Sequence, residues 1–445
     1  MKMKIDKDVE IIMNYLNESN FEVFIVGGLI RDEFMCKKPN DWDIATDATP
    51  DEIINVFEKT EFKIVDISKK HGTIIIINNK KLYEITTFRI DGDYINNRRP
   101  KEVKFTKKIE DDLKRRDFTM NAMAYSNEKG LIDLFNGIDD IENKTIKCVG
   151  DPEIRFKEDA LRMLRAVRFS AQLNFKIENN TYNAIKSNIN LINNLSMERI
   201  REEFNKILIS DYPEKGIRLL KELKILELLI PEIEMCYEFN QHNINHNKDV
   251  FEHTLEVVKN VENNLVLRLS AFFHDIGKPL SFFMDNDGVG HFYGHDKLSV
   301  DITRNILVRM KYSNDIINEV LSLIETHMVV YRDEFKNSTV KKLMKKVNIE
   351  NLIKFQIADI KATANPNKYE HVFRLEKRCK EIINNKEPLD VKQLKINGYD
   401  LIEMGVQQGK LIGEILNELL EIVLENPKLN EKEKLLEIVK RKWLI

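Results

Sequence analysis

The sequence predicts a multidomain protein with an α/β head followed by an all-helical remainder. Over the first 145 residues strand-like and helix-like hydrophobic periods alternate, whereas beyond Lys147 the pattern is almost purely helical. A chain of 445 residues with 42% hydrophobic side chains is also long enough for roughly three or four compact units. We expect a head at 1–145, a helical neck at 146–240, a histidine-rich domain at 241–365 and a helical tail at 366–445.

The head is expected to open with an amphipathic helix, a strand and a glycine turn. Apolar residues recur at helical spacing from Ile5 to Leu16, and the apolar run Phe21–Val26 stops at Gly27-Gly28. A helix start is expected at Thr49-Pro50, because Thr49 is a suitable N-cap and Glu52 follows three residues later. The other elements expected in the head are strands at 41–45, 73–77 and 81–88, the last two joined as a hairpin around Asn78-Asn79.

Beyond the head the chain is expected to be helical. Asp151-Pro152 opens a long helical region, in which 158–169 has the pattern of a single amphipathic helix. We expect no strand after Lys147. Seven of the nine histidines lie between His242 and His327, which indicates a separate domain there.

Composition excludes several classes of protein. The four cysteines form no CxxC pair, which favours reduced thiols and a cytoplasmic location over a disulfide framework. The longest strongly apolar run, Ile74–Ile77, is far too short to span a membrane, so no membrane association is expected. A net charge of −3 does not exclude a nucleic-acid partner, because binding RNA needs only a local basic face.

Two aspartates in the head are candidate metal ligands. Side chains at i and i+2 of a strand share one face, so Asp41 and Asp43 present two carboxylates about 6–7 Å apart at their Cα atoms. Such a pair repels unless a cation lies between, and Mg²⁺ prefers oxygen ligands. Glu84 on a neighbouring strand is a candidate third catalytic carboxylate. The sequence therefore indicates a magnesium-dependent displacement at a phosphate.

The glycine turn beside these aspartates fits a phosphate site. Glycine lets backbone N–H groups approach a triphosphate, so Gly28 is a candidate phosphate contact, and Arg31 can neutralise phosphate charge. Taken separately, a plain turn and a solvated strand end would explain these residues. The order strand, glycine pair, Arg31-Asp32, then strand with Asp41 and Asp43 is more specific than its parts.

The neck carries a carboxylate and three arginines at helical spacing. Arg162, Arg165 and Arg168 recur every three residues and so share one broad face. Asp159 lies three residues before Arg162 and can hold its guanidinium. Because arginine only donates and aspartate only accepts, the pair can match the hydrogen-bonding edge of a base. The alternative is an ordinary helix with a solvated charged face.

These motifs resemble those of a known family. The stretches GGLIRDEF and DWDIAT look like the signature of the DNA polymerase β nucleotidyltransferase superfamily. Together with RRDFTMNAMA (115–124) and EDALRMLRAVRF (158–169), they resemble more closely the class II tRNA nucleotidyltransferases, or CCA-adding enzymes, and the related bacterial poly(A) polymerases. The resemblance implies a head with a mixed sheet, in which Arg116 reaches the nucleotide. It also implies that Asp159, Arg162, Arg165 and Arg168 select CTP or ATP.

The histidine-rich segment resembles a second superfamily, the HD phosphohydrolases. The residues that carry this resemblance are His253, the pair His274-Asp275 and Asp359. They imply a site for a divalent metal of undetermined identity, to which His295 and His327 are spaced to add further ligands. A bound metal can activate water for phosphoester hydrolysis.

We therefore expect an enzyme that adds C, C and A to tRNA from CTP and ATP, with Mg²⁺ as cofactor and a possible hydrolase activity on RNA 3′ ends. The segment 91–100 resembles the flexible loop of full CCA-adding enzymes, which disfavours a CC-only activity. Within the class, a poly(A) polymerase or A-adding enzyme remains the alternative. From another class, the alternative is a catalytically inactive RNA-binding or nucleotide-sensing regulator.

Overall fold

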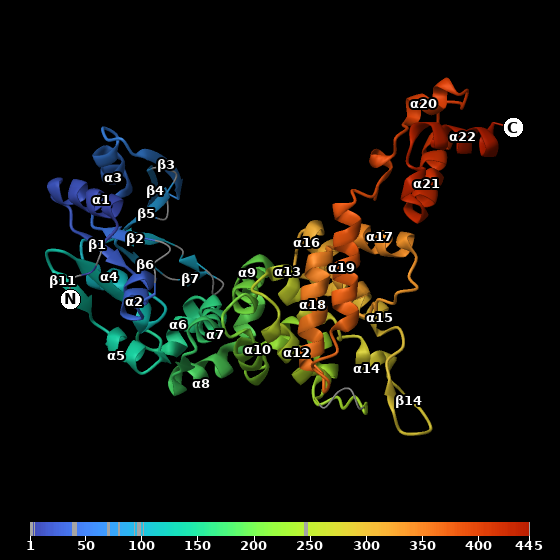
Figure 1. Ribbon diagram of the computed structural model, residues 1–445. Coiled ribbons are helices and arrows are strands. Elements are labelled where there is room, and N and C mark those ends of the chain that lie inside the picture. The colour runs from blue at the N-terminus through green and yellow to red at the C-terminus, as the bar shows by residue number, and fades with distance from the viewer. Residues whose placement is uncertain are drawn as a thin grey trace. The chain divides into compact units, whose positions relative to one another are not determined.

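The computed structural model describes residues 3, 5–37, 42–68, 72–78, 81–92, 94–95, 99–100, 102–243 and 248–444. They form two compact units, Met1–Leu229 and Ile230–Ile445, whose elements are labelled in Figure 1. The first unit contains the α/β head and the helices that follow it, and the second is almost entirely helical. The expected fold class is confirmed.

A seven-stranded mixed sheet organises the head. Its strand order is β11-β10-β1-β2-β5-β4-β3, in which β2 and β5 are parallel and the other neighbours antiparallel. The expected hairpin is confirmed as β4 and β5. The strands are β1 (Val23–Val26), β2 (Asp43–Thr46), β3 (Lys63–Ser68), β4 (Thr73–Asn78), β5 (Lys81–Thr87), β10 (Met123–Ser126) and β11 (Gly130–Asp133).

Helices and short ribbons complete the head. Helix α3 begins with the expected capping box, since the Thr49 side chain accepts from the Glu52 N–H and the Glu52 side chain accepts from the Thr49 N–H. Aromatic and aliphatic side chains such as Phe24 and Phe88 form a core between sheet and helices. The helices are α1 (Lys7–Glu18), α2 (Gly28–Phe34), α3 (Pro50–Phe57), α4 (Ile109–Lys114) and α5 (Gly137–Glu142); the ribbons pair β6 (Arg89–Asp91) with β9 (Val103–Phe105) and β7 (Tyr94–Ile95) with β8 (Arg99–Pro100).

The neck helix expected at 158–169 is interrupted, so that prediction was wrong. Helix α6 ends at Glu158, Asp159 is extended with φ −134° and ψ 105°, and α7 begins at Leu161. The Asp159 side chain accepts from the Leu161 N–H at 3.1 Å and so caps the second helix. The neck helices are α6 (Pro152–Glu158), α7 (Leu161–Leu173), α8 (Asn179–Asn188), α9 (Met197–Leu208), α10 (Pro213–Glu222) and α11 (Ile225–Leu229).

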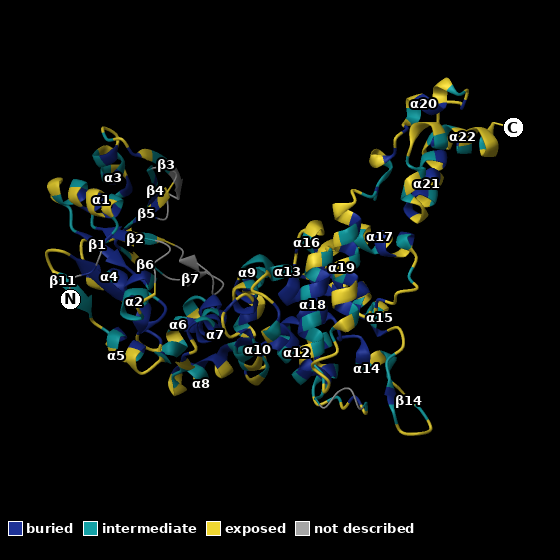
Figure 2. Ribbon diagram, in the orientation of Figure 1, coloured by how far each residue is buried: buried dark blue, intermediate teal, exposed yellow. Residues whose placement is uncertain are grey.

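The second unit is built on apolar helices. Leu267–Phe273 of α13 is buried throughout (Figure 2), and α12, α13, α16 and α18 pack against one another. A separate apolar cluster, which includes Leu401 and Val423, forms the core of the C-terminal helices. These elements are α12 (Val250–Asn260), α13 (Leu265–Phe273), α14 (Lys278–Ser281), α15 (His295–Arg309), α16 (Asn314–Thr326), α17 (Asn337–Lys346), α18 (Ile349–Ala362), α19 (Glu370–Asn384), α20 (Gly398–Glu403), α21 (Lys410–Glu425) and α22 (Lys432–Trp443).

In the part of the chain that the structure describes, three two-residue strands lie beyond Lys147, where none was expected. Strand β13 (Lys176–Ile177) pairs with β12 (Thr145–Ile146), and β14 (Phe283–Met284) pairs with β15 (Gly290–His291). Two residues cannot establish a period of two, so the hydrophobic pattern could not reveal these strands. Among the described residues, no helix has both the length and the apolar character needed to cross a membrane.

Candidate active site

The glycine turn, a strand carboxylate and an arginine meet at one point of the head. Strand β1 ends at Val26; Gly27 follows with a φ of 81° and a ψ of −142°, which favour glycine, and helix α2 starts at Gly28. A Cβ on Gly27 would lie 3.0 Å from Arg116 Nη1 and 3.4 Å from Asp43 Oδ2. A side chain at Gly27 would therefore require Arg116 or Asp43 to shift.

Asp43 has a second carboxylate beside it. It is the first residue of β2, and its register partner on the parallel strand β5 is Glu84. Paired residues of neighbouring strands point to the same face, and both residues are exposed there. Asp41, the other expected metal ligand, lies outside the described residues. Two carboxylates on one exposed face suit a hard divalent cation.

The Arg31 side chain is buried and hydrogen-bonded within the protein. It is 8% exposed, and its Nε and Nη2 donate to Asp32 Oδ1 at 2.9 and 2.7 Å. Its Nη1 donates to Asn121 Oδ1 at 2.8 Å. These contacts fix the guanidinium beside Gly28, where an added Cβ would lie 3.2 Å from Arg31 Nη2.

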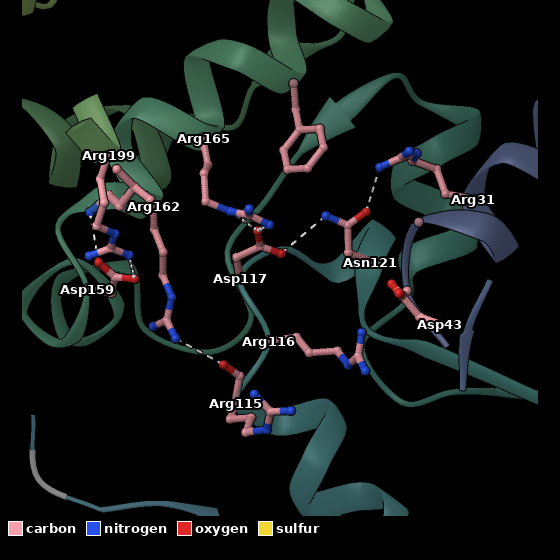
Figure 3. Close-up of a pocket in the computed structure, with 14 residues that line it drawn as sticks. Arg31, Asp43, Arg115, Arg116, Asp117, Asn121, Asp159, Arg162, Arg165 and Arg199 are labelled. Carbon is pink, nitrogen blue, oxygen red and sulfur yellow. Dashed lines mark hydrogen bonds and ion pairs between the residues drawn. The ribbon is translucent and has the colours of Figure 1, made fainter. Parts of the chain in front are cut away.

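A buried aspartate joins the head to the neck helix. Asp117 Oδ2 accepts from Arg165 Nε at 2.7 Å, and Asp117 Oδ1 accepts from Asn121 Nδ2 at 3.2 Å and from the Phe118 N–H at 2.8 Å. Burial opposes ionisation, but the Arg165 charge and these hydrogen bonds lower the pKa of Asp117 to about 2. A chain of hydrogen bonds thus runs from Arg31 through Asn121 and the ionised Asp117 to Arg165 (Figure 3).

The expected contact between Asp159 and Arg162 is replaced by two separate ones. Asp159 Oδ2 accepts from Arg199 Nη2 at 2.9 Å, whereas Arg162 Nη1 donates to Glu158 Oε2 at 2.7 Å. Arg162 Nη2 also donates to the carbonyl of Arg115 at 3.0 Å. The break after Glu158 explains the difference, because it removes Asp159 from the regular helix that the three-residue spacing assumed.

Arg168 has a carboxylate partner on another helix. Its Nη1 pairs with Glu203 Oε1 on α9 at 2.9 Å, and its guanidinium lies 4.3 Å from the centre of the Phe169 ring. Burial, with the neighbouring Arg165 charge, lowers the pKa of Arg168 to about 10. Arg168 thus contacts Phe169 and is not among the residues that line the cavity described next.

These groups surround a cavity of about 430 Å³ (Figure 3). Six arginines and three aspartates line it, an excess of positive charge that suits a polyanionic ligand. Residues of the head and residues of the neck share this one space. The lining residues are Gly27, Gly28, Arg31, Asp43, Arg115, Arg116, Asp117, Asn121, Asp159, Leu161, Arg162, Arg165, Phe169 and Arg199.

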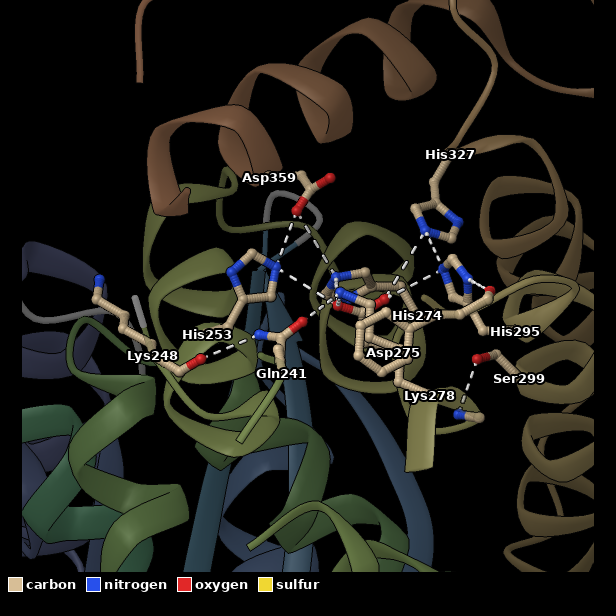
Figure 4. Close-up of polar contacts among 12 residues, drawn as sticks. Gln241, Lys248, His253, His274, Asp275, Lys278, His295, Ser299, His327 and Asp359 are labelled. Carbon is tan, nitrogen blue, oxygen red and sulfur yellow. Dashed lines mark hydrogen bonds and ion pairs between the residues drawn. The ribbon is translucent and has the colours of Figure 1, made fainter. Parts of the chain in front are cut away.

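The second unit contains a buried cluster of histidines and aspartates (Figure 4). In a first group, His253 Nε2 and His274 Nε2 lie 3.0 and 3.7 Å from Asp359 Oδ1. His274 Nδ1 faces the Ala271 carbonyl at 2.8 Å and so carries the proton, which leaves Nε2 as an acceptor. That Nε2 is buried and lies 3.1 Å from Asp275 Oδ2 as well as 3.7 Å from Asp359 Oδ1. A buried imidazole nitrogen between two carboxylates fits a metal ligand.

A second group of three ligands adjoins the first. His295 Nε2 and His327 Nε2 lie 3.4 and 3.9 Å from Asp275 Oδ1 and 3.3 Å from each other. Their Nδ1 atoms face the carbonyls of Phe292 and Ile324 at 2.8 and 2.6 Å, so both Nε2 atoms are free to accept. The six residues proposed from the sequence are therefore brought together as two possible three-ligand sites.

Comparison with known proteins identifies the family. Residues 23–147 match the family model "Poly A polymerase head domain", and 174–236 match "Probable RNA and SrmB- binding site of polymerase A". Residues 296–439 match the "tRNA nucleotidyltransferase domain 2" model. The CCA-adding enzyme of Ligilactobacillus salivarius is 34% identical over 440 residues, which cover 97% of this chain and 95% of that protein. The chain belongs to the CCA-adding enzymes.

Solved structures agree with this membership. The Bacillus stearothermophilus CCA-adding enzyme in complex with CTP matches with a TM-score of 0.74 and 25% identity, over 98% of this chain and 99% of that one. The Thermotoga maritima CCA-adding enzyme complexed with tRNA shares the fold, with a TM-score of 0.58 and 22% identity over 98% and 96% of the two chains. Nucleotidyltransferases of this family use divalent metals, which agrees with the paired carboxylates of the head.

The cavity residues that sequence reasoning missed include Asp117, Asn121 and Arg199. Asp117 and Asn121 lie four residues apart in the RRDFTMNAMA block, and that spacing was the available signal. Arg199 carries no local signal, because only packing of α9 beside the start of α7 brings it to Asp159.

Proposed function

We propose that this member of the CCA-adding enzymes adds C, C and A to the 3′ end of tRNA from CTP and ATP and releases pyrophosphate. The observation that carries the proposal is the single cavity in which Asp43 and Arg116 face Asp159 and Arg162. A triphosphate and a base can occupy that space together. The relatives named CCA-adding enzyme, one of them solved with CTP, support the same reaction.

In this proposal the head binds the reacting groups. Asp43, with Asp41 and with Glu84 beside it, holds Mg²⁺, which when bound activates the attacking 3′-hydroxyl and stabilises the leaving pyrophosphate. The backbone at Gly28, together with Arg31 and Arg116, holds the triphosphate. The absence of a side chain at Gly27 leaves space for Arg116 Nη1 and Asp43 Oδ2 to lie beside the turn.

The neck reads the base. Asp159 accepts and Arg162 donates, so together they can pair with the complementary edges of cytosine and adenine. Arg199 and Glu158 hold the two side chains independently, which fixes their orientation before a nucleotide enters. Arg165, fixed by Asp117, adds positive charge beside them.

The proposed parts divide the work along the chain. The head at 1–145 and the neck at 146–240 carry out transfer, and the tail at 366–445 contributes to docking tRNA through its phosphates. We also propose a cytoplasmic location, because all four cysteines are free.

The reaction is tested with tRNAs that end before, within or after CCA, supplied with CTP and ATP separately. We expect CTP alone to extend only the ends that lack one or both C residues. ATP alone should extend only the end that has both C residues and lacks the terminal A. Asp43→Ala and Asp41→Ala should each abolish extension while tRNA binding persists, and Glu58→Ala, an exposed carboxylate on the same domain, should behave as wild type. Unlimited A addition would instead show a poly(A) polymerase, and binding without metal-dependent extension would show a regulator.

A second candidate function rests on the histidine cluster. We propose that His253, His274, Asp275 and Asp359, joined by His295 and His327, hold one or two divalent metals that activate water for hydrolysis of phosphoesters at RNA 3′ ends. A terminal phosphate blocks the hydroxyl that the head needs as nucleophile. A hydrolase on the same chain would clear that end before extension.

The two activities should separate under mutation, because the cluster and the cavity share no residue. A chain with His274→Ala and Asp275→Ala should lose phosphate release from a 3′-phosphorylated tRNA yet extend an unblocked tRNA. His371→Ala, a histidine outside both groups, is the matched control. The assay compares Mg²⁺, Mn²⁺ and Ni²⁺, and absence of phosphate release by wild type with all three rejects the hydrolase.

A further inference from the structure

Asp112 is a buried carboxylate shared by two consecutive arginines. It lies on α4, and its side chain is 0% exposed. Its Oδ1 accepts from Arg115 Nε and Nη2 at 3.0 and 2.7 Å, and its Oδ2 accepts from Arg116 Nε and Nη2 at 3.3 and 3.1 Å. One side chain therefore holds both guanidinium groups.

One of these arginines faces the phosphate side of the cavity. With Nε and Nη2 turned to Asp112, Arg116 keeps Nη1 toward the Gly27 turn, 3.0 Å from the position of an added Cβ. Asp43 Oδ2 lies 3.4 Å from the same position. The bond to Asp112 therefore decides which edge of the Arg116 guanidinium is presented to a bound triphosphate.

The other arginine, Arg115, contacts Arg162 through its backbone carbonyl. The carbonyl of Arg115 accepts from Arg162 Nη2 at 3.0 Å. The Arg115 side chain is tied to Asp112 and lies 3.9 Å from Asp91 Oδ2. Fixing this side chain restrains the peptide whose carbonyl orients Arg162.

The charge of Asp112 is maintained in spite of its burial. Burial by itself raises the pKa of a carboxyl, but the positive charges of Arg116 and Arg115 lower the pKa of Asp112 below its usual value. Charge-assisted hydrogen bonds of this kind are about twice as strong as neutral ones.

We propose that Asp112 is a positioning residue that couples triphosphate binding to base choice, through Arg116 on one side and through Arg115 and Arg162 on the other. This inference rests on the proposed nucleotide addition. Asp112 does not line the cavity, so it acts by orienting the arginines that do.

The test is Asp112→Asn, which keeps the shape and removes the charge, compared with Glu110→Gln, an exposed carboxylate on the same helix. KM for CTP and ATP should rise about tenfold, and kcat/KM for CTP over UTP should fall about tenfold. That ratio cancels any loss of folded enzyme, so a merely structural role would not change it. Glu110→Gln should leave both quantities at the wild-type value.

Two further variants test the route through Arg116 and the route through Arg115 separately. They replace Asp112→Asn if that variant does not fold. Arg116→Lys should raise KM for both nucleotides with little effect on the CTP to UTP ratio. Arg115→Lys should lower the ratio with less effect on KM. An unchanged ratio in Asp112→Asn, or in Arg115→Lys where the first variant is insoluble, overturns the proposed coupling. If the wild-type protein adds no nucleotide, the proposed function itself is wrong. Measuring the wild type before the variants therefore distinguishes that outcome from failure of the proposed coupling.

Discussion

Replacing Gly27 by alanine tests whether the glycine turn, the metal carboxylate and the phosphate-facing arginine form one compact site. The backbone at φ 81° and ψ −142° lies where residues with a Cβ are strained by about 1–3 kcal/mol. The new Cβ would also meet Arg116 Nη1 at 3.0 Å and Asp43 Oδ2 at 3.4 Å. Gly27→Ala should therefore lose stability through the backbone and activity through displaced side chains.

The size of the activity loss follows from the contacts of Arg116. Moving its guanidinium weakens the two hydrogen bonds to Asp112 at 3.3 and 3.1 Å. A hydrogen bond to a charged group contributes about 1.5–3 kcal/mol, so nucleotide addition should fall by about 10- to 100-fold. Primer extension at several CTP concentrations measures this loss, and urea unfolding measures the stability.

Gly130→Ala is the matched control. Gly130 also has a positive φ, 69°, but a Cβ there would meet nothing within 4 Å. It should lose stability with little change in extension. If Gly27→Ala extends tRNA at a rate within twofold of that of Gly130→Ala, the close packing of Asp43 and Arg116 does not require glycine at position 27.

Three other predictions follow from named contacts. Asp159→Ala should relax the preference for CTP and ATP over GTP and UTP by about 1–3 kcal/mol more than it slows any single addition, and an unchanged preference measured with competing nucleotides contradicts the base-reading role. The pKa of Asp117 is lowered to about 2, so its stabilisation of about 2 kcal/mol is present above its unfolded pKa near 3.8 and disappears as pH falls through 2. Asp117→Asn should reduce the pH dependence of the urea unfolding midpoint between pH 4 and 2. Mn²⁺ or Ni²⁺ should raise the melting temperature of the full chain, and His295→Ala should reduce that rise, unlike His371→Ala.

Local patterns predicted several elements of the head. The capping box at Thr49 and the β4–β5 hairpin are encoded by residues adjacent in the chain, so no distant contact is needed to specify them. The helix expected at 158–169 failed for a related reason. The spacing of charged and apolar residues over 158–169 fits a single helix, but Asp159 is extended and separates α6 from α7.

The sequence by itself determined the residue types of both sites, because metal ligands, glycine turns and charged motifs are set by chemistry that is readable at short range. Which side chains meet was decided only by the tertiary structure. Asp159 meets Arg199 from another helix, and Arg168 turns to Glu203 instead of the cavity. A guanidinium can pair with any carboxylate that packing brings near, so spacing along one helix cannot choose its partner. The same holds for the histidine cluster, where ligands from His253 to Asp359 converge only because their helices pack together.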